Sequence, residues 1–303
     1  MSSVLVDVEG QTLKLSNLEK VLYPETGFTK AEVIDYYTRI APVLLPHLAD
    51  RALTRKRFPD GVESEPFFEK NAPSHTPDWV RTEVLPTPGS TMGRETLRFV
   101  VVEDLATVVW LANLAALELH LPQWRVDAGG DVHDPDLVVF DLDPGPPADI
   151  VACSRVAVLL RDALAEDGLE AYAKTSGRKG MQLYVPIAET PAERTSAYAK
   201  GLAERLEKAN PKLVVSRMTK NLRKDKVFID WSQNNAFKTT IAPYSLRAAP
   251  TPTVSTPVEW AEVEACTHVR DLRFEAEDVL TRVAEGGNLL APLIDGPHHE
   301  LPA

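Results

Sequence analysis

The sequence predicts an α+β fold, in which central β-sheets are flanked by helices. Helical and strand patterns follow one another without a regular strand–helix–strand alternation, which argues against a doubly wound parallel sheet. The chain has 303 residues, of which 44% are hydrophobic and 25% are charged, so it is long enough to bury a sizeable core. We expect one domain over residues 1–303, with residues 291–303 as a short tail.

The N-terminal part is expected to contain two helices and a hairpin. Thr29 and Glu32 have the spacing of a capping box, so a helix should begin there and be interrupted near Pro42. Residues 51–70 contain two short strand patterns around a Pro-Asp-Gly turn. Apolar residues recur at helical spacing over residues 103–120, which predicts a second helix.

The rest of the chain continues this mixture of strands and helices. The segment LVVFDLD predicts a buried strand, and LEAYAKTSGRKGMQLYVPI predicts a strand, a tight loop and a strand. Helices are expected over residues 148–167, where Gly168 suits the position after the helix end, and over residues 191–209, ended by Asn210-Pro211. A short strand (LVVS), a basic loop (RMTKNLRKDK) and the strand VFIDWS follow. We expect residues 248–258 to form a surface loop that leads to a helical C-terminal segment.

Charge and cysteine usage narrow the class of protein. The formal net charge of −11 weighs against a nucleic-acid partner, but residues 212–247 carry eight Lys or Arg against two Asp or Glu. Cys153 and Cys266 lie far apart without a CxxC spacing, which favours reduced thiols over a disulfide framework or a zinc site. We find no signal peptide pattern or membrane-spanning run, so we expect a cytoplasmic protein without a membrane partner.

Paired carboxylates are the most informative feature of the sequence. Asp141 and Asp143 end a buried strand pattern and, two residues apart, should project to one face of the strand. At roughly 4 Å apart, two such charges repel by about 4 kcal/mol at an effective dielectric constant of about 20, so a positive group should lie nearby. Asp230 ends another strand pattern. Three carboxylates from two strands would suit Mg²⁺ or Mn²⁺.

The loop TSGRKG between two strands could hold a phosphate, because a glycine turn presents backbone N–H groups while Ser176 and Lys179 add a hydroxyl and a charge. Each feature has a plainer interpretation: a DxD pair is more often a turn or cap, and the glycine loop is more often a simple hairpin. Together they suggest metal-assisted phosphoryl or nucleotidyl transfer.

A series of longer phrases extends this suggestion over most of the chain. The phrases are NLEKVLYPETGFTKAEVIDYY, LTRKRFPDGV, PFFEKN, DLATVVWLANLAALELHLPQW, LVVFDLDPG, TSGRKGMQLYVPI, KVFIDWSQNNAFKTTIAPYSLR and WAEV. In these phrases and their order, residues 13–290 resemble the polymerase domain of bacterial ligase D, within the archaeo-eukaryotic primase superfamily. The resemblance implies a primase-polymerase fold and a template-directed nucleotidyltransferase that adds NTPs or dNTPs to primers with two Mn²⁺ or Mg²⁺ ions.

The resemblance also implies roles for single residues. The matched catalytic metal ligands are Asp141, Asp143 and Asp230. The nucleotide-binding set is Lys56, His120, Ser176, Gly177, Lys179, Gln182 and Arg247. For DNA, Phe67 and Phe68 match stacking aromatics, Lys20 and Lys30 a pocket for a 5′-phosphate, and Arg223 and Lys226 a mobile basic loop near the primer end.

One position departs from the family pattern, which usually has histidine where this chain has Gln182. Glutamine can donate a neutral hydrogen bond but cannot carry a charge, and charge-assisted hydrogen bonds are roughly twice as strong as neutral ones. We therefore expect weaker triphosphate binding, or a site in which Gln182 depends more on Lys179 and Arg247.

The resemblance implies DNA partners with 5′-phosphorylated gaps or broken ends in bacterial non-homologous end joining, together with Ku and a separate ligase. We expect a stand-alone, nucleoid-associated polymerase, since the chain has no room for a ligase or nuclease domain. Two alternatives remain open. One is a catalytically weak or silent protein that binds and bridges DNA ends. The other is a haloacid-dehalogenase-like phosphatase, suggested by VVFDLD, although this motif continues as Pro-Gly instead of Gly-Thr.

Overall fold

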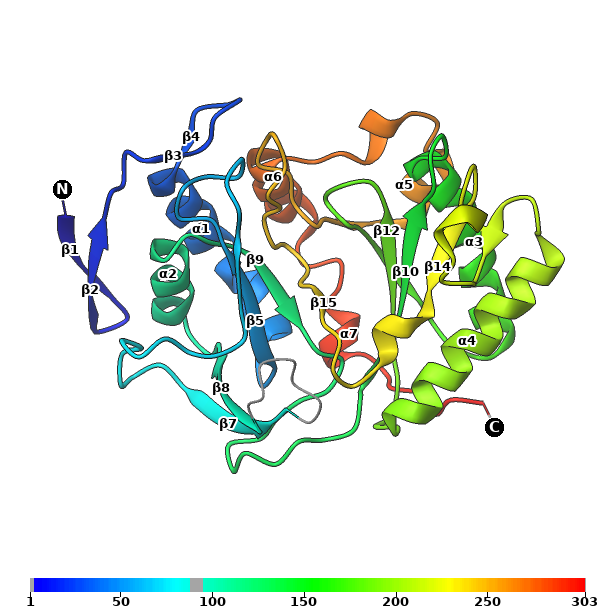
Figure 1. The fold of residues 1–303 in the computed structure, drawn as a ribbon, viewed down its shortest axis with the longest axis horizontal. Helices are drawn as coiled ribbons and strands as arrows, with labels where there is room; N and C mark the ends of the chain where they lie inside the picture. Colours follow the sequence, from blue (N-terminus) through cyan, green and yellow to red (C-terminus); the bar gives the residue numbers. More distant parts are fainter. Residues whose placement is uncertain (1–2, 88–94, 303) are drawn as a thin grey trace.

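The computed structural model describes residues 3–87 and 95–302, and it contains an antiparallel β-sheet and a mixed β-sheet side by side, with helices around them (Figure 1). The first sheet has the strand order β15 (Thr240–Ile241), β9 (Ala116–Leu121), β5 (Ala52–Arg57), β8 (Thr96–Val101) and β7 (Thr82–Pro86), with β6 (Phe67–Glu69) also paired to β5. Helices α1 (Lys30–Leu48) and α2 (Leu105–Asn113) pack with it in one hydrophobic core. Two small hairpins, β1 (Ser3–Val8) with β2 (Gln11–Ser16) and β3 (Val21–Tyr23) with β4 (Phe28–Thr29), precede α1.

The second sheet has its own hydrophobic core. Its strand order is β13 (Val214–Val215), β14 (Val227–Asp230), β10 (Leu137–Pro144), β12 (Met181–Pro186), β11 (Tyr172–Thr175) and β16 (Pro257–Val258). Helices α3 (Ile150–Glu166), α4 (Ala192–Ala209) and α5 (Trp260–Ala265) pack with this sheet. The mixture of helices and sheets confirms the predicted α+β class.

The side chains of strand β10 alternate between the two faces of the second sheet. Val138, Phe140 and Leu142 are buried in the core with α3 and α4, because alternate side chains of a strand share a face. Leu137 and Val139 point to the opposite face, where they pack in a smaller apolar cluster. Asp141 and Asp143 continue this second face beyond the cluster, so the aspartates avoid the core.

Several predicted elements are confirmed. Thr29 caps α1, and its side chain and that of Glu32 form the reciprocal bonds of the capping box. The hairpin β5–β6, the strand β10 and the hairpin β11–β12 form as expected. Gly168 follows α3 with a φ of 76°, and α4 ends at Ala209, before Asn210.

Three element predictions are wrong. Helix α1 continues through Pro42 and Pro46 to Leu48, since its apolar face is buried along its whole length. The helix predicted over residues 103–120 ends at Asn113; Ala115 has a φ of 56°, and the sequence ALELHL then pairs as strand β9 with β5. Residues 251–258 are buried, not a surface loop, because their backbone bonds to neighbours on both sides, as in Thr175 N–H to Thr256 O (2.8 Å).

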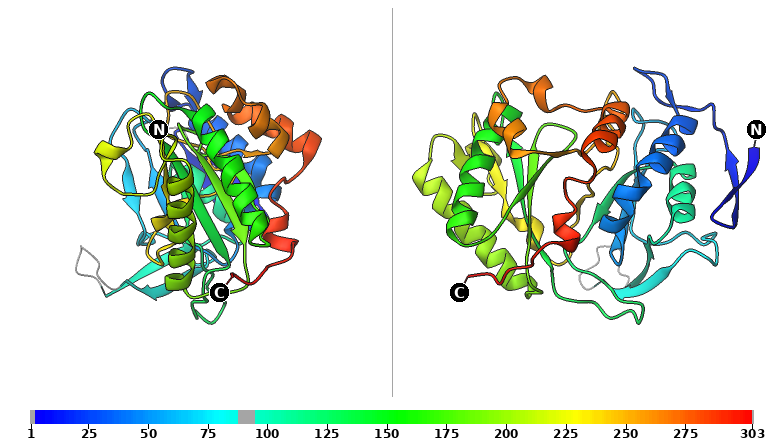
Figure 2. Two further views of the ribbon diagram at one scale, coloured as in Figure 1. Left: turned by 90° about the vertical axis from the view of Figure 1, so that its right-hand side faces the viewer. Right: turned by 180° about the vertical axis from the view of Figure 1, so that it is seen from behind.

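The C-terminal part of the chain passes between the two sheets. Strand β15 belongs to the first sheet, β16 to the second, helix α6 (Ala276–Gly286) contacts α1, and α7 (Pro292–Asp295) contacts β12. Seen from behind, α6 and α7 lie along the junction of the two halves (Figure 2). Among the described residues, none of the helices is both long enough and apolar enough to cross a membrane.

Candidate active site

The three expected carboxylates lie together on two neighbouring strands. Asp141 of β10 is paired directly with Asp230 of β14, and Asp143 follows two residues further along β10. Directly opposed residues of an antiparallel pair project to the same face, with Cβ atoms about 4.5–5.5 Å apart. All three side chains therefore project from one face of the second sheet, as the period-two pattern predicts for Asp141 and Asp143.

The pKa values of Asp141 and Asp143 are both raised. Burial and the charge of Asp143 raise the pKa of Asp141 to about 7, and Asp230 adds to this rise. Desolvation in the cleft and the charge of Asp230 also raise the pKa of Asp143, whereas Arg223 opposes the rise. A cation bound here would relieve this repulsion, which is the physical reason that the site suits a metal ion.

The side chain of Asp230 is occupied by local donors. It accepts hydrogen bonds from the backbone N–H (3.0 Å) and hydroxyl (2.5 Å) of Ser232 and from Nε2 of Gln233 (2.8 Å). Over residues 3–87 and 95–302, no group of three or more His, Cys, Asp or Glu side chains is placed to hold a metal ion. The donor set still fits Mg²⁺ or Mn²⁺, because it consists of carboxylate oxygens on one sheet face; Asp230 would have to exchange its local bonds for the ion.

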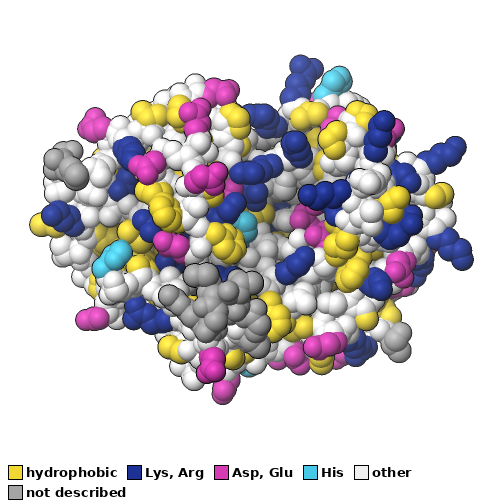
Figure 3. Space-filling view, in the orientation of Figure 1, with side chains coloured by type: hydrophobic (Ala, Val, Ile, Leu, Met, Phe, Trp, Pro, Cys, Tyr) yellow, Lys and Arg dark blue, Asp and Glu magenta, His cyan; other side chains and the backbone are white. Residues whose placement is uncertain are grey.

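A cleft of about 610 Å³ opens next to these carboxylates. Its lining includes eight of the expected residues, namely His120, Asp141, Asp143, Ser176, Gly177, Lys179, Gln182 and Arg247. Arg178, Gln233 and Arg273 also line it and were not predicted. On the face shown in Figure 3, lysine and arginine side chains gather around a hollow near the centre, despite the net negative charge of the whole chain.

The loop between β11 and β12 is shaped by Ser176 and Gly177. The Ser176 hydroxyl oxygen accepts hydrogen bonds from the backbone N–H groups of Arg178 (3.2 Å) and Gly180 (3.1 Å). Since both bonds use its oxygen, the hydroxyl hydrogen remains available to donate to a phosphate. Gly177 has a φ of 70°, and an added Cβ would lie 2.5 Å from Cγ of Arg247, so the loop packs directly against this arginine.

A buried glutamate that sequence reasoning missed organises the basic side of the cleft. Glu118 is fully buried and lies within 3.5 Å of four basic groups: His120 (3.1 Å), Arg178 (3.4 Å), Arg247 (3.4 Å) and Lys56 (3.5 Å). Although burial would raise it, the pKa of Glu118 is held well below its usual range by the His120 hydrogen bond and the neighbouring cations. Lys56 thus joins the predicted nucleotide-binding group through Glu118.

Gln182 is buried and paired differently from what the sequence predicts. It lies between Asp141 on β10 and Lys174 on β11, paired in register with both. Its Oε1 accepts a hydrogen bond of 2.6 Å from the ammonium of Lys174, a residue that was not predicted. The expected partners Lys179 and Arg247 line the same cleft, and the side chain that donates a hydrogen bond to Gln182 is Lys174.

The residues predicted to contact DNA lie outside this cleft. Phe67 and Phe68 on β6 are 53% and 57% exposed, which is unusual for phenylalanine and leaves both rings available for stacking. Lys20 and Lys30 are neighbours, since the backbone N–H of Lys30 donates to the carbonyl of Lys20 (2.8 Å). Burial, then the charges of Lys20 and Arg57, lower the pKa of Lys30 to about 8, which marks a locally positive environment.

The basic loop residues differ in their positions. Arg223 stacks over the ring of Phe228 at 3.7 Å and lies near enough to Asp143 to affect its pKa. Lys226 donates instead to the carbonyl of Pro211 (2.6 Å). The structure thus connects Arg223, more than Lys226, with the carboxylates.

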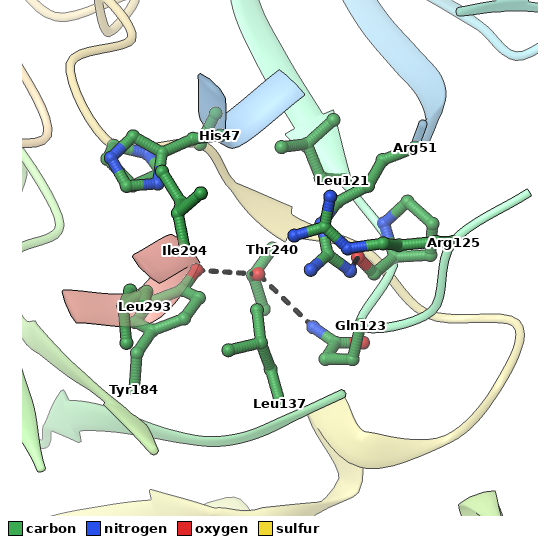
Figure 4. Close-up of a pocket in the computed structure, with 13 residues that line it drawn as sticks. His47, Arg51, Leu121, Gln123, Arg125, Leu137, Tyr184, Thr240, Leu293 and Ile294 are labelled. Atoms are coloured by element: carbon green, nitrogen blue, oxygen red, sulfur yellow. Dashed lines mark hydrogen bonds between the residues drawn. The ribbon is translucent and has the colours of Figure 1, made fainter. Parts of the chain in front are cut away.

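A second, much smaller cavity lies between the two sheets (Figure 4). Its volume of about 20 Å³ has room for about one water molecule, so it is not a substrate site. At its floor, Thr240 of β15 bonds to the hydroxyl of Tyr184 on β12 (2.7 Å) and to Gln123 (3.2 Å). This cavity therefore marks a polar contact between the two halves.

Comparison with known proteins supports the predicted resemblance. The family model for the primase-polymerase domain of LigD matches residues 29–290. The chain is 47% identical over 285 residues to the multifunctional non-homologous end joining protein LigD of Mycolicibacterium smegmatis, covering 93% of this chain and 36% of that protein. It is 34% identical to the bifunctional LigD protein of Bacillus subtilis, covering 91% of this chain and 43% of that protein.

A solved structure shares both fold and sequence. The polymerase domain of Mycobacterium tuberculosis ligase D in complex with DNA superposes with a TM-score of 0.87 at 41% identity, covering 94% of this chain and 99% of that one. The chain thus spans less than half the length of these curated relatives but nearly all of the solved domain. The chain belongs to the primase-polymerase domain family of LigD, whose members are nucleotidyltransferase-type polymerases.

Proposed function

We propose that this protein is a template-directed nucleotidyltransferase that extends primers at gaps and double-strand-break ends, using NTPs or dNTPs. The observation that carries the proposal is the position of Asp141, Asp143 and Asp230 on one face of the second sheet, beside a cleft lined with basic side chains. The family membership supports polymerisation over the phosphatase alternative.

The residues of the cleft divide the chemistry between them. Asp141, Asp143 and Asp230 would hold two Mn²⁺ or Mg²⁺ ions, which supply acidification of the primer hydroxyl and neutralisation of the leaving pyrophosphate when bound. Lys179 and Arg247 line the same cleft and would bind the phosphates as cations, with the Ser176 hydroxyl as a further donor. Transfer would join the primer 3′-oxygen to the α-phosphorus, break the bond to pyrophosphate and release the hydroxyl proton to water. Because a bound cation would acidify the hydroxyl, no side-chain base would be required.

The DNA would lie across the cleft, with its two ends held by separate groups. Lys20 and Lys30 would bind a 5′-phosphate, and the exposed rings of Phe67 and Phe68 would stack on bases near the break. Arg223 would act near the primer end, close to Asp143. The M. tuberculosis domain was solved with DNA, and the named relatives are non-homologous end joining proteins. With this function, Ku and a separate DNA ligase would be its partners. The protein would then be cytoplasmic and associated with the nucleoid.

The test is primer extension on a duplex with a 5′-phosphorylated gap, with Mn²⁺ or Mg²⁺ and with NTPs or dNTPs. We expect extension that requires a divalent ion and that Asp141→Asn lowers by at least 100-fold. The matched control is Asp162→Asn, which changes an exposed aspartate of α3 outside the cleft and should retain full activity. DNA binding without metal-dependent extension would contradict the polymerase and favour the end-bridging alternative.

A further inference from the structure

A row of polar residues crosses four strands of the second sheet. Lys174 of β11 is paired in register with Gln182 of β12, which is paired with Asp141 of β10, which is paired with Asp230 of β14. Directly opposed residues share a face of the sheet. The row therefore leads from a buried lysine at one end to the proposed metal ligands at the other.

The two hydrogen-bond acceptors of Lys174 are neutral groups. Its side chain is fully buried, and its ammonium donates to Oε1 of Gln182 (2.6 Å) and to Oγ of Ser255 (2.5 Å), with the Tyr184 ring at 5.3 Å. A buried cation without a charged partner is costly, and such groups are rare unless they are paired. Burial, then the charge of Arg247, lower the pKa of Lys174 well below its ordinary value, and the charge of Asp141, on the far side of Gln182, opposes this shift.

The lysine determines which way the Gln182 amide points. Oε1 of Gln182 accepts the hydrogen bond from Nζ of Lys174 (2.6 Å), so the carbonyl end of the amide faces Lys174. The amide NH₂ of Gln182 then faces the opposite way along the row, where the side chain hydrogen-bonds to Asp141 and opposes the rise of its pKa. Without Lys174, either end of the amide could face Asp141, and the carbonyl end would repel the carboxylate.

We propose that Lys174 is a positioning residue of the polymerase site, which acts through Gln182 to orient Asp141 for a divalent cation. The inference rests on the proposed function. It differs from the expectation that Gln182 would depend on Lys179 and Arg247.

The first test is Lys174→Met, which keeps an unbranched side chain and removes the ammonium. We expect the Mn²⁺ concentration needed for half-maximal rise in Tm of the DNA-free protein to increase 10- to 100-fold, the range for groups that orient metal ligands. In primer extension, kcat should fall by a similar factor while KM for the nucleotide changes less than threefold. The matched control is Lys200→Met, an exposed lysine of α4, which should change neither quantity.

The second test asks whether Lys174 acts through Gln182. In a double-mutant cycle, adding Lys174→Met to Gln182→Met should change the Mn²⁺ midpoint little. Gln182→Met alone already removes the hydrogen bonds that link Lys174 to Asp141. Additive effects in the cycle, or an unchanged midpoint in Lys174→Met alone, would overturn the proposal. If Lys174→Met does not fold, Ser255→Ala removes one of the two hydrogen-bond acceptors of Lys174; a threefold or larger rise in the midpoint supports the proposal and no rise overturns it.

The two readouts separate this inference from the proposed function. Wild-type protein that binds Mn²⁺ but extends no primer would contradict polymerase activity, and the Mn²⁺ midpoints would still report on Lys174. Wild-type protein that extends primers, with a variant of equal kcat and equal Mn²⁺ midpoint, would overturn the role of Lys174 alone.

Discussion

Glu118 is a single buried carboxylate on which the basic side of the cleft depends. It bonds to His120 and the backbone N–H of Ala248 (3.1 Å) and lies close to the cationic groups of Lys56, Arg178 and Arg247. The incoming triphosphate would bring further negative charge to these cations. Glu118 therefore holds them in place before the nucleotide arrives.

We predict that Glu118→Gln lowers the free energy of unfolding by about 3–5 kcal/mol, because it leaves several cations without their buried counterion. Inorganic tripolyphosphate should then raise the Tm of the variant more than that of the wild type, since it replaces the missing charge. Thermal unfolding with and without tripolyphosphate checks both effects. The exposed substitution Glu204→Gln on α4 is the control. An equal tripolyphosphate response in variant and wild type would show that Glu118 does not organise this anion site.

At the residue scale, alternation along one strand was enough to predict that Asp141 and Asp143 share a face. Glu118 was missed because a helical pattern was assigned to its segment, and the left-handed φ of Ala115 that ends the helix has no signature in an alanine. Lys174 was missed although a signal existed. The hairpin β11–β12 is symmetric about Arg178, so a lysine four residues before this centre must face the glutamine four residues after it.

The loop of residues 176–180 is the element that joins the two sides of the cleft. Gly177 has a left-handed φ of 70°, and its missing side chain leaves room for Arg247 Cγ and the backbone of Val254. Glycine is required here both by backbone conformation and by space. This packing fixes the backbone of the loop that carries Ser176 and Lys179.

We predict that Gly177→Ala lowers kcat/KM for the nucleotide by at least tenfold, because the new methyl group must displace Arg247. The matched control is Gly168→Ala, at a φ of 76° with no atom within 4 Å of the added Cβ, which should lower stability by about 1 kcal/mol without changing nucleotide use. Steady-state extension with varied NTP, together with urea unfolding, separates the two. Equal kcat/KM in the two variants would refute this role of the loop.

At the element scale, local signals predicted the elements whose ends are marked by caps or turns. Thr29 with Glu32, the Pro-Asp-Gly turn and Gly168 mark their boundaries by local chemistry. The errors arose where tertiary packing overrides local preference. Burial keeps α1 helical past Pro42. Pairing with β11 on one side and with residues 244–247 on the other buries residues 251–258 in spite of their polar, proline-rich composition.

At the scale of the whole molecule, His47 couples folding stability to pH. It is buried near the end of α1, across the small cavity from Arg51 and Arg125 (Figure 4). Its hydrogen-bond partner is Asn288. Burial, then the charges of Arg51, Arg125 and Lys174, lower its pKa to about 4, although Asn288 opposes the shift. The unfolded chain, with a histidine pKa of about 6.5, binds more protons between these two values.

We therefore predict that the contribution of His47 to stability is complete above about pH 6.5 and is lost as the pH falls toward 4, by about 3 kcal/mol in total. In His47→Gln, which keeps a neutral hydrogen-bonding group, the free energy of unfolding should fall less steeply over this range. Urea unfolding at pH 7.5, 5.5 and 4.5 measures the difference, and His133→Gln at an exposed histidine is the control. Parallel pH profiles for wild type and His47→Gln would contradict the prediction.

The path of the C-terminal segment has a consequence for how this protein could be divided. From β15 the backbone returns to the second sheet at β16, goes back to α1 through α6, and reaches β12 again through α7. Neither half is encoded by one uninterrupted stretch, so a truncation before residue 257 would remove a strand from one half and a helix from the other. We therefore expect that no shorter segment of this chain can be expressed as a folded polymerase domain.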